Sequence, residues 1–124
     1  MKRILAALLC SVISCAAVAA GNINTGKALA EKYSCATCHG KDYASPIDPS
    51  YPKLAGQHEN YLYKQLVDFT TPQRNQPVMS TYAKMLSDAD KKNVAAYLGA
   101  QLAKPGAAKN KDTIELGKKI YRGG

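Results

Sequence analysis

Residues 35–40 read CATCHG, which places two thiols three positions apart and an imidazole directly after the second thiol. Two uses of this motif fit the remaining sequence poorly. A redox dithiol normally accompanies a βαβ pattern, and no alternating apolar and polar stretch predicts a strand in this chain. A structural zinc ion needs four ligands, and after residue 20 only His58 adds another imidazole or thiolate, at a spacing unusual for zinc.

The order Cys-X-X-Cys-His instead predicts covalent attachment of haem. Each thiol adds across one vinyl group of the porphyrin, and the interval between Cys35 and Cys38 suits the separation of the two vinyl groups. His39 then falls beneath the porphyrin as the proximal ligand of the iron. The motif therefore predicts one haem c, held by Cys35, Cys38 and His39.

The chain has 124 residues, with one Phe and no Trp, so its own core is expected to be thin. Apolar residues at helical spacing predict helices over 25–35, over 58–69, and from Ser87 to an end before Pro105. Prolines and glycine break the regions 41–56 and 70–78, which predicts long loops there. We therefore expect an all-α protein, with three to four helices and long loops wrapped around one covalent haem.

Residues 1–20 have the layout of a secretory signal peptide, with two early cations, an apolar run and small residues before the expected cut after Ala20. The apolar run is short for a membrane span. The sequence thus predicts export to the periplasm. A second interpretation stays open, because residues 12–15 resemble a lipoprotein cleavage box that would leave a lipid anchor on Cys15.

The second axial ligand decides what the iron does, because an open position admits small ligands whereas two protein ligands favour electron transfer. Met79 lies in a loop held by Pro77, which suits it to reach the iron. Met85 lies in a short apolar stretch expected to be helical, and His58 opens a predicted helix. On the residues alone, all three stay candidates, with Met79 preferred.

Several further segments resemble class I c-type cytochromes, and most closely the first half of a dihaem cytochrome c4. They are residues 35–40, 51–57, 61–66, 86–88 and 95–98, together with Met79. The resemblance covers most of residues 25–103 and implies the class I cytochrome c fold. It also implies that Met79, seven residues before the Leu of the Leu-Ser-Asp segment, is the second iron ligand.

The resemblance implies two more features of the site and its frame. The carbonyl of Pro52 is expected to bind the other ring nitrogen of His39, and Gly26 and Tyr97 are expected to mark the crossing of the first and last helices. Tyr43 departs from the family pattern, which usually has glycine at this position after the haem motif.

The family further implies an electron carrier, not an enzyme, that passes electrons from a bc1-type complex towards a terminal cytochrome oxidase in a respiratory chain. Two other functions stay open: a haem-based enzyme or gas-binding protein with a labile sixth ligand, and an inactive fragment of a dihaem cytochrome. The net charge of +8 at pH 7 fits an acidic redox partner. Peripheral attachment to anionic lipid is a second use of this charge, and no nucleic-acid motif is present.

The C-terminal residues repeat the start of the predicted haem domain. Gly117-Lys118-Lys119-Ile120 echoes Gly26-Lys27-Ala28-Leu29 at an offset of 91 residues. The preceding segment is rich in Lys, Ala and Gly, as linkers are. We therefore expect a haem domain over 21–104, and over 105–124 a linker followed by the opening of a second, truncated cytochrome c repeat.

Overall fold

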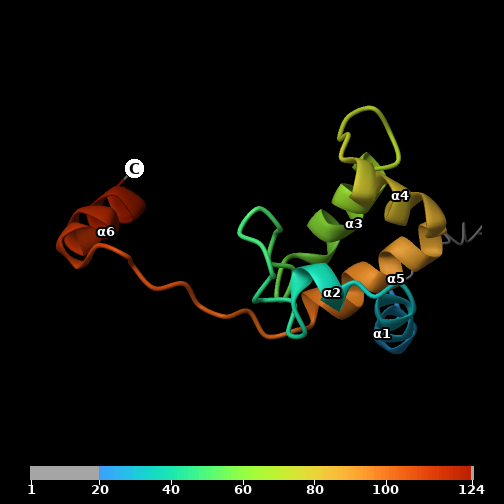
Figure 1. The fold of residues 1–124 in the computed structure, drawn as a ribbon. Coiled ribbons are helices and arrows are strands. Elements are labelled where there is room, and N and C mark those ends of the chain that lie inside the picture. The colour runs from blue at the N-terminus through green and yellow to red at the C-terminus, as the bar shows by residue number, and fades with distance from the viewer. Residues whose placement is uncertain (1–19, 124) are drawn as a thin grey trace, which may run out of the picture.

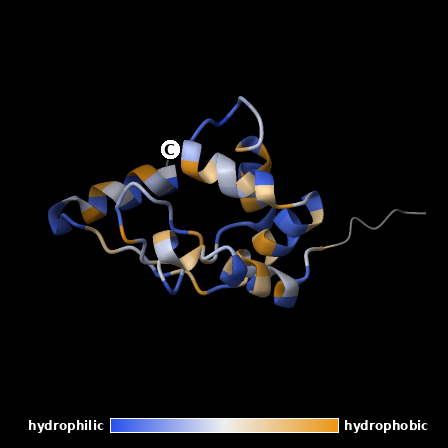
Figure 2. Ribbon diagram, turned by 45° about the vertical axis from the view of Figure 1, so that its right-hand side comes forward, coloured by the Kyte–Doolittle hydropathy of each residue, from blue (hydrophilic) through white to orange (hydrophobic). Residues whose placement is uncertain are grey.

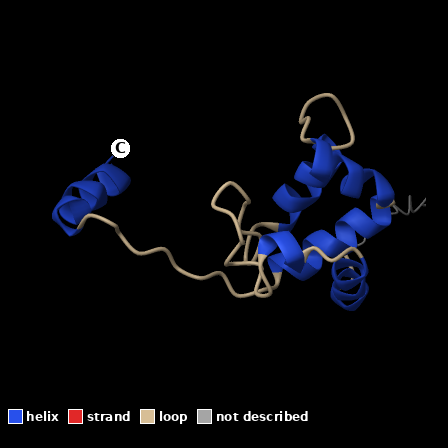
Figure 3. Ribbon diagram, in the orientation of Figure 1, coloured by secondary structure: helices blue, strands red, loops and turns tan. Residues whose placement is uncertain are grey.

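The computed structural model describes residues 20–123, and within them the chain is helical with no strand (Figures 1 and 3). In chain order the elements are α1 (Ile23–Lys32), α2 (Ala36–His39), α3 (Glu59–Asp68), α4 (Pro77–Met85), α5 (Asp88–Gly99), the 3-10 helix η1 (Lys111–Thr113) and α6 (Ile114–Gly123). The predicted all-α fold is confirmed. The predicted signal peptide, apart from Ala20, lies outside the described residues, as does Cys15.

Residues 21–104 hold five helices, whereas three to four were predicted. The sequence did not predict α2, which covers the end of the CATCHG motif. α4 includes the stretch at Met85 that was expected to be helical, but it begins earlier, inside a predicted loop. The first helix also begins earlier than predicted, because the side chain of Asn22 accepts a hydrogen bond from the Thr25 amide (2.9 Å) and caps Ile23 onwards.

α5 begins where its sequence predicts, with Ser87 as its N-cap. Ser87 accepts a hydrogen bond from the Asp90 amide (3.1 Å), and the Asp90 carboxylate accepts one from the Ser87 amide (3.2 Å). This reciprocal capping box satisfies two amide groups that the first turn of α5 would leave unpaired.

α1 and α5 cross at Gly26, as the resemblance implied. A Cβ atom on Gly26 would lie 2.0 Å from the Asn93 carbonyl oxygen and 2.8 Å from the Tyr97 Cβ. No side chain fits in that space, so glycine is required for the two backbones to approach this closely. The contact joins α1 to α5, which lie 56 or more residues apart in the sequence.

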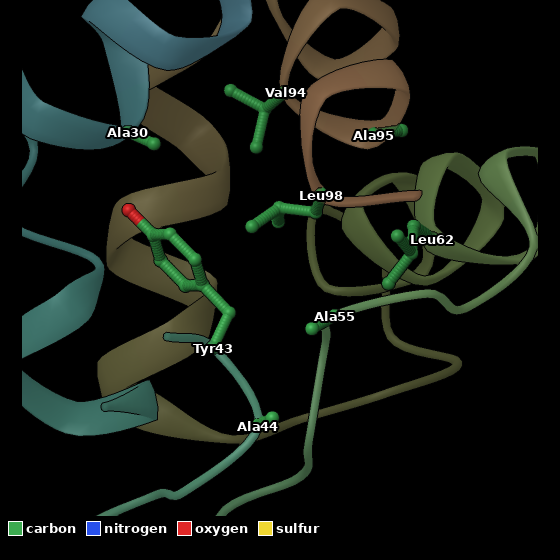
Figure 4. Close-up of a cluster of buried hydrophobic side chains, with 8 residues drawn as sticks. All are labelled: Ala30, Tyr43, Ala44, Ala55, Leu62, Val94, Ala95 and Leu98. Carbon is green, nitrogen blue, oxygen red and sulfur yellow. The ribbon is translucent and has the colours of Figure 1, made fainter. Parts of the chain in front are cut away.

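The buried core consists mostly of small side chains, and Figure 4 shows how they gather between α1, α3, α5 and the loop after α2. Its members are Ala30, Tyr43, Ala44, Ala55, Leu62, Val94, Ala95 and Leu98. Hydrophilic and hydrophobic residues share the helices that surround it (Figure 2), as expected when one face of each helix packs inward. Four alanines fill little volume, so the protein part of the core is thin.

Tyr43, the departure from the family pattern, belongs to this core. Its φ of 54° lies in the left-handed region, which explains the usual preference for glycine at the position. The side chain is 4% exposed, and its ring packs edge-on against Tyr97 with 5.8 Å between centroids. Burial raises the pKa of the Tyr43 hydroxyl to about 12.

After α5 the chain stays tied to the loop that follows the haem motif. Lys104 forms an ion pair with Asp42 and hydrogen-bonds the Ser45 hydroxyl (3.0 Å). This lysine and the Ala44 and Ser45 amides hold the pKa of Asp42 well below its ordinary value. The chain then extends away to α6, which lies apart from α1–α5 in Figure 1. Within residues 20–123, none of the helices is both long and apolar enough to span a bilayer.

Candidate haem site

Local hydrogen bonds shape the CATCHG motif before any cofactor is considered. After α1 the chain turns through Ser34, whose φ is 53°, and the Cys35 amide donates to the Ala30 carbonyl (3.0 Å). Cys35 is then the N-cap of α2, and Cys38 and His39 follow within that short helix. Because residues three apart share one side of a helix, α2 brings both thiols to the same side.

Two adjoining hollows meet at this motif. The larger has a volume of about 460 Å³ and the smaller about 150 Å³. Both are lined mainly by apolar side chains, and six residues line both: Cys38, His39, Leu54, Leu66, Met79 and Leu98. Their combined size and apolar lining suit a large, flat organic cofactor.

His39 is 6% exposed and is oriented by the loop opposite it. Its Nδ1 lies 2.9 Å from the Pro52 carbonyl oxygen. Because a carbonyl can only accept, Nδ1 is the donor, and Nε2 is left without a proton and able to bind a metal. The loop itself is held in place by the Tyr43 carbonyl, which accepts from the amides of Leu54 (2.8 Å) and Ala55 (3.0 Å).

The two thiols have the chemistry of attachment points more than of a redox pair. Neither Cys35 nor Cys38 is in a disulfide. Burial raises the pKa of the Cys35 thiol, and the nearby Cys38 adds to this effect. Catalytic dithiols need the opposite shift, since the thiolate is their reactive form. In the described part of the chain, no three His, Cys, Asp or Glu side chains are grouped to hold a bare metal ion.

The structure separates the three candidates for the second axial ligand. Met79 is half-buried and lines both hollows together with His39. Met85 is 48% exposed and lines neither. His58 is exposed at the N-cap of α3 and borders a different hollow, beside Gly99. Of these three side chains, only Met79 shares the space that His39 lines.

Met79 lies in a helix and not in the loop that was predicted for it. Pro77 occupies the first position of α4, where its missing amide proton costs nothing. The Gln76 side chain accepts from the Met79 amide (2.7 Å), which caps the helix. The same proline that suggested a loop therefore starts α4, and the first turn of α4 carries Met79 to the hollows.

Several residues of the larger hollow were not identified from the sequence. They include Tyr51, Lys53, Tyr61, Gln65, Phe69 and Arg74. The helical spacing of residues 58–69 showed that one face of α3 is apolar, but it did not show that this face borders the cofactor space. For Arg74, in the proline-broken loop before α4, the sequence held no signal.

The residues present fit a covalently bound haem. Its site needs two thiols one helical turn apart, an imidazole whose free nitrogen faces an apolar space, and room for a porphyrin. Cys35, Cys38 and His39 meet the first two needs, and the adjoining hollows meet the third.

Comparison with known proteins gives a consistent result. A family model described as cytochrome c oxidase, cbb3-type, subunit III matches residues 21–98. Cytochrome c4 of Pseudomonas aeruginosa is 38% identical over 125 residues, which cover 100% of this chain and 60% of that protein. The chain thus spans about 60% of the length of this curated relative.

Two further comparisons cover most of the chain. A thiosulfate dehydrogenase electron acceptor of Stutzerimonas stutzeri is 40% identical over 103 residues, or 83% of this chain and 48% of that protein. The crystal structure of reduced recombinant cytochrome c4 from Pseudomonas stutzeri matches with a TM-score of 0.68 and 33% identity, over 85% of this chain and 58% of that chain.

Proposed function

The chain belongs to the class I c-type cytochromes, in the family described as cytochrome c oxidase, cbb3-type, subunit III, and we propose that it carries single electrons with His39 and Met79 as the axial ligands of its haem iron. Haem c is the cofactor of such a domain, and it supplies a one-electron iron couple. The observation that carries the proposal is that His39 and Met79 line the same two hollows.

In this proposal the chain's own residues hold and tune the iron. The Pro52 carbonyl keeps the Nδ1 proton of His39 in place, which directs Nε2 to the metal and increases its basicity. The Met79 thioether would favour the ferrous state, since a His/Met pair raises the reduction potential of a haem. If His39 and Met79 both hold the iron, no position would remain for a substrate, so the protein would act as a carrier and not as an enzyme.

The thiols of Cys35 and Cys38 would bind the porphyrin through two thioether bonds, which prevents its loss. The surrounding loops then need only to exclude water from the apolar hollows. Because the attached haem would complete the packing, a core of mostly small side chains is sufficient for a protein of this size. Ligands that the fold already holds in place would need little rearrangement when the electron enters or leaves.

The proposal extends to location, partners and chain organisation. We place the protein in the periplasm after removal of residues 1–20, as a carrier between a bc1-type complex and a terminal oxidase. One relative is named as an electron acceptor of thiosulfate dehydrogenase, which supports redox proteins as partners in general. Residues 21–104 would form the haem domain, and residues 105–124 the linker and the opening of a second repeat.

Optical spectra of the exported holoprotein test the axial ligands. We expect a methionine–iron charge-transfer band in the oxidised protein and no reaction of the reduced protein with carbon monoxide. Met79→Ala should abolish the band and permit carbon monoxide binding. Met85→Ala and His58→Ala are the matched controls and should change neither property. An unchanged spectrum in Met79→Ala would refute the ligand assignment, and carbon monoxide binding by the wild type would favour a gas-binding function.

A further inference from the structure

The residues that line the two hollows are unevenly charged. Lys53 and Arg74 line the larger hollow, and neither lines the smaller. No Asp or Glu lines either one. Cys35 lines only the smaller hollow. Both cations therefore border the larger hollow, which Cys38 also lines, whereas Cys35 borders only the smaller one.

Arg74 is the better placed of the two cations to bind an anion in this space. Its guanidinium lies over the Phe69 ring, 4.3 Å from the ring centroid, and donates one hydrogen bond to the side-chain oxygen of Gln65. Phe69 is 8% exposed, and all three residues line the larger hollow. Stacking on a buried ring restricts the position of the guanidinium, so less entropy is lost when it binds a ligand.

The guanidinium keeps most of its hydrogen-bonding capacity. An arginine has five N–H donors, and the described contacts use one of them, on a neutral amide. In the described part of the chain no carboxylate forms an ion pair with Arg74. A fixed cation with free donors, facing a hollow that lacks acidic side chains, is suited to a planar carboxylate.

Haem c carries two propionate carboxylates at an edge that is distinct from its thioether-bonded edge. Once Cys35 and Cys38 hold the thioether edge, the carboxylates must lie elsewhere in the space, and Lys53 and Arg74 are the cationic side chains that line it. We propose that Arg74 binds a haem propionate and, through its charge, raises the reduction potential of the iron. This inference rests on the proposed haem site and assigns one further residue to it.

The sign of the effect follows from electrostatics. Reduction lowers the charge of the iron centre by one unit, so a nearby cation favours the reduced form. Because Arg74 is an exposed residue, water and salt weaken its electrostatic effect on the iron. Removal of the charge should therefore shift the ratio of reduced to oxidised protein by about two- to fivefold towards the oxidised form at a fixed electrode potential.

Spectroelectrochemistry of three holoprotein variants tests the charge. Arg74→Gln removes the cation, Arg74→Lys retains it without the planar stacking group, and Lys84→Gln makes the same charge change at an exposed residue of α4 that lines neither hollow. We expect the full shift in Arg74→Gln, less than half of it in Arg74→Lys, and less than half of it in Lys84→Gln. Equal shifts in Arg74→Gln and Lys84→Gln, or no shift in Arg74→Gln, would overturn the proposal.

Infrared difference spectra between the two redox states test the contact itself. Haem made from 5-aminolevulinate with a labelled carboxyl carbon has labelled propionates, so their bands can be separated from those of the protein. Arg74→Gln should move a labelled band, and Lys84→Gln should not; labelled bands that stay in place in both would contradict the contact. A wrong Met79 assignment would appear separately, as a missing methionine band in the wild type.

Discussion

The Nδ1 atom of His39 lies 2.9 Å from the carbonyl oxygen of Pro52, thirteen residues along the chain. The contact joins the haem motif to the loop across from it. A carbonyl oxygen can only accept a hydrogen bond. The neutral imidazole can therefore make this contact only in the tautomer that carries its proton on Nδ1. This tautomer leaves Nε2 free to bind a metal. The loop that carries Pro52 sets the tautomer, and the CATCHG motif does not.

Pro52→Ala should loosen this contact without removing the carbonyl. We expect the free energy of unfolding to fall by about 0.4–1 kcal/mol, because the unfolded chain gains freedom when proline is lost. Exchange of the His39 Nδ1 proton, followed by NMR, should also become faster. Pro49→Ala, in the same loop but without a contact to His39, is the control. Equal exchange rates in the two variants would show that Pro52 does not fix the carbonyl.

Gly26→Ala should destabilise the haem domain by about 2–3 kcal/mol, because its methyl group would lie 2.0 Å from the Asn93 carbonyl oxygen and force α1 away from α5. Urea unfolding followed by circular dichroism measures the change. Gly117→Ala is a matched control at the equivalent position of α6, where nothing lies within 4 Å of the added atom. Gly117→Ala should not lower the free energy of unfolding. A decrease as large as that of Gly26→Ala would disprove the role of the helix crossing.

Tyr43 should make stability fall at high pH. Its hydroxyl has a pKa of about 12 in the folded protein and about 10 when unfolded. Between these values the unfolded state binds fewer protons, so the free energy of unfolding decreases as the pH rises. The contribution is complete below pH ~10 and is lost as the pH rises through ~12.

Tyr43→Phe should flatten this pH dependence, as measured by urea unfolding at a series of pH values. Tyr121→Phe removes a hydroxyl from a side chain that is 92% exposed and should leave the slope as in the wild type. The prediction fails if the two variants have the same slope.

Removal of both attachment thiols should leave a largely unfolded chain. Four of the eight side chains in the main buried cluster are alanine, so we expect the porphyrin to be needed to complete the core. We expect Cys35→Ala/Cys38→Ala, purified without haem, to show weak helical circular dichroism and no cooperative melting. A fully helical product with a sharp melting transition would mean that the polypeptide packs adequately on its own.

The CATCHG motif and the helix signals could be interpreted from sequence because they depend on neighbouring residues. Attachment of haem needs two thiols and an imidazole at set intervals, and the capping box at Ser87 needs only Asp90. The same local logic failed at α4. A proline such as Pro77 can either break a helix or occupy its first position. Here the side chain of Gln76 caps the helix, so Pro77 begins α4. The assignment of Met79 as an iron ligand stays a prediction in either case.

The sequence by itself determined the cofactor, the helical class and the family, because covalent attachment and helix formation are encoded in contacts a few residues long. Only the tertiary structure decided which sulfur shares a hollow with His39, where Tyr43 lies, and that Arg74 stacks on Phe69 beside that hollow. Those relationships join residues from separate elements. They depend on how α2, α3, α4 and the loops beside them pack together, which no local pattern specifies.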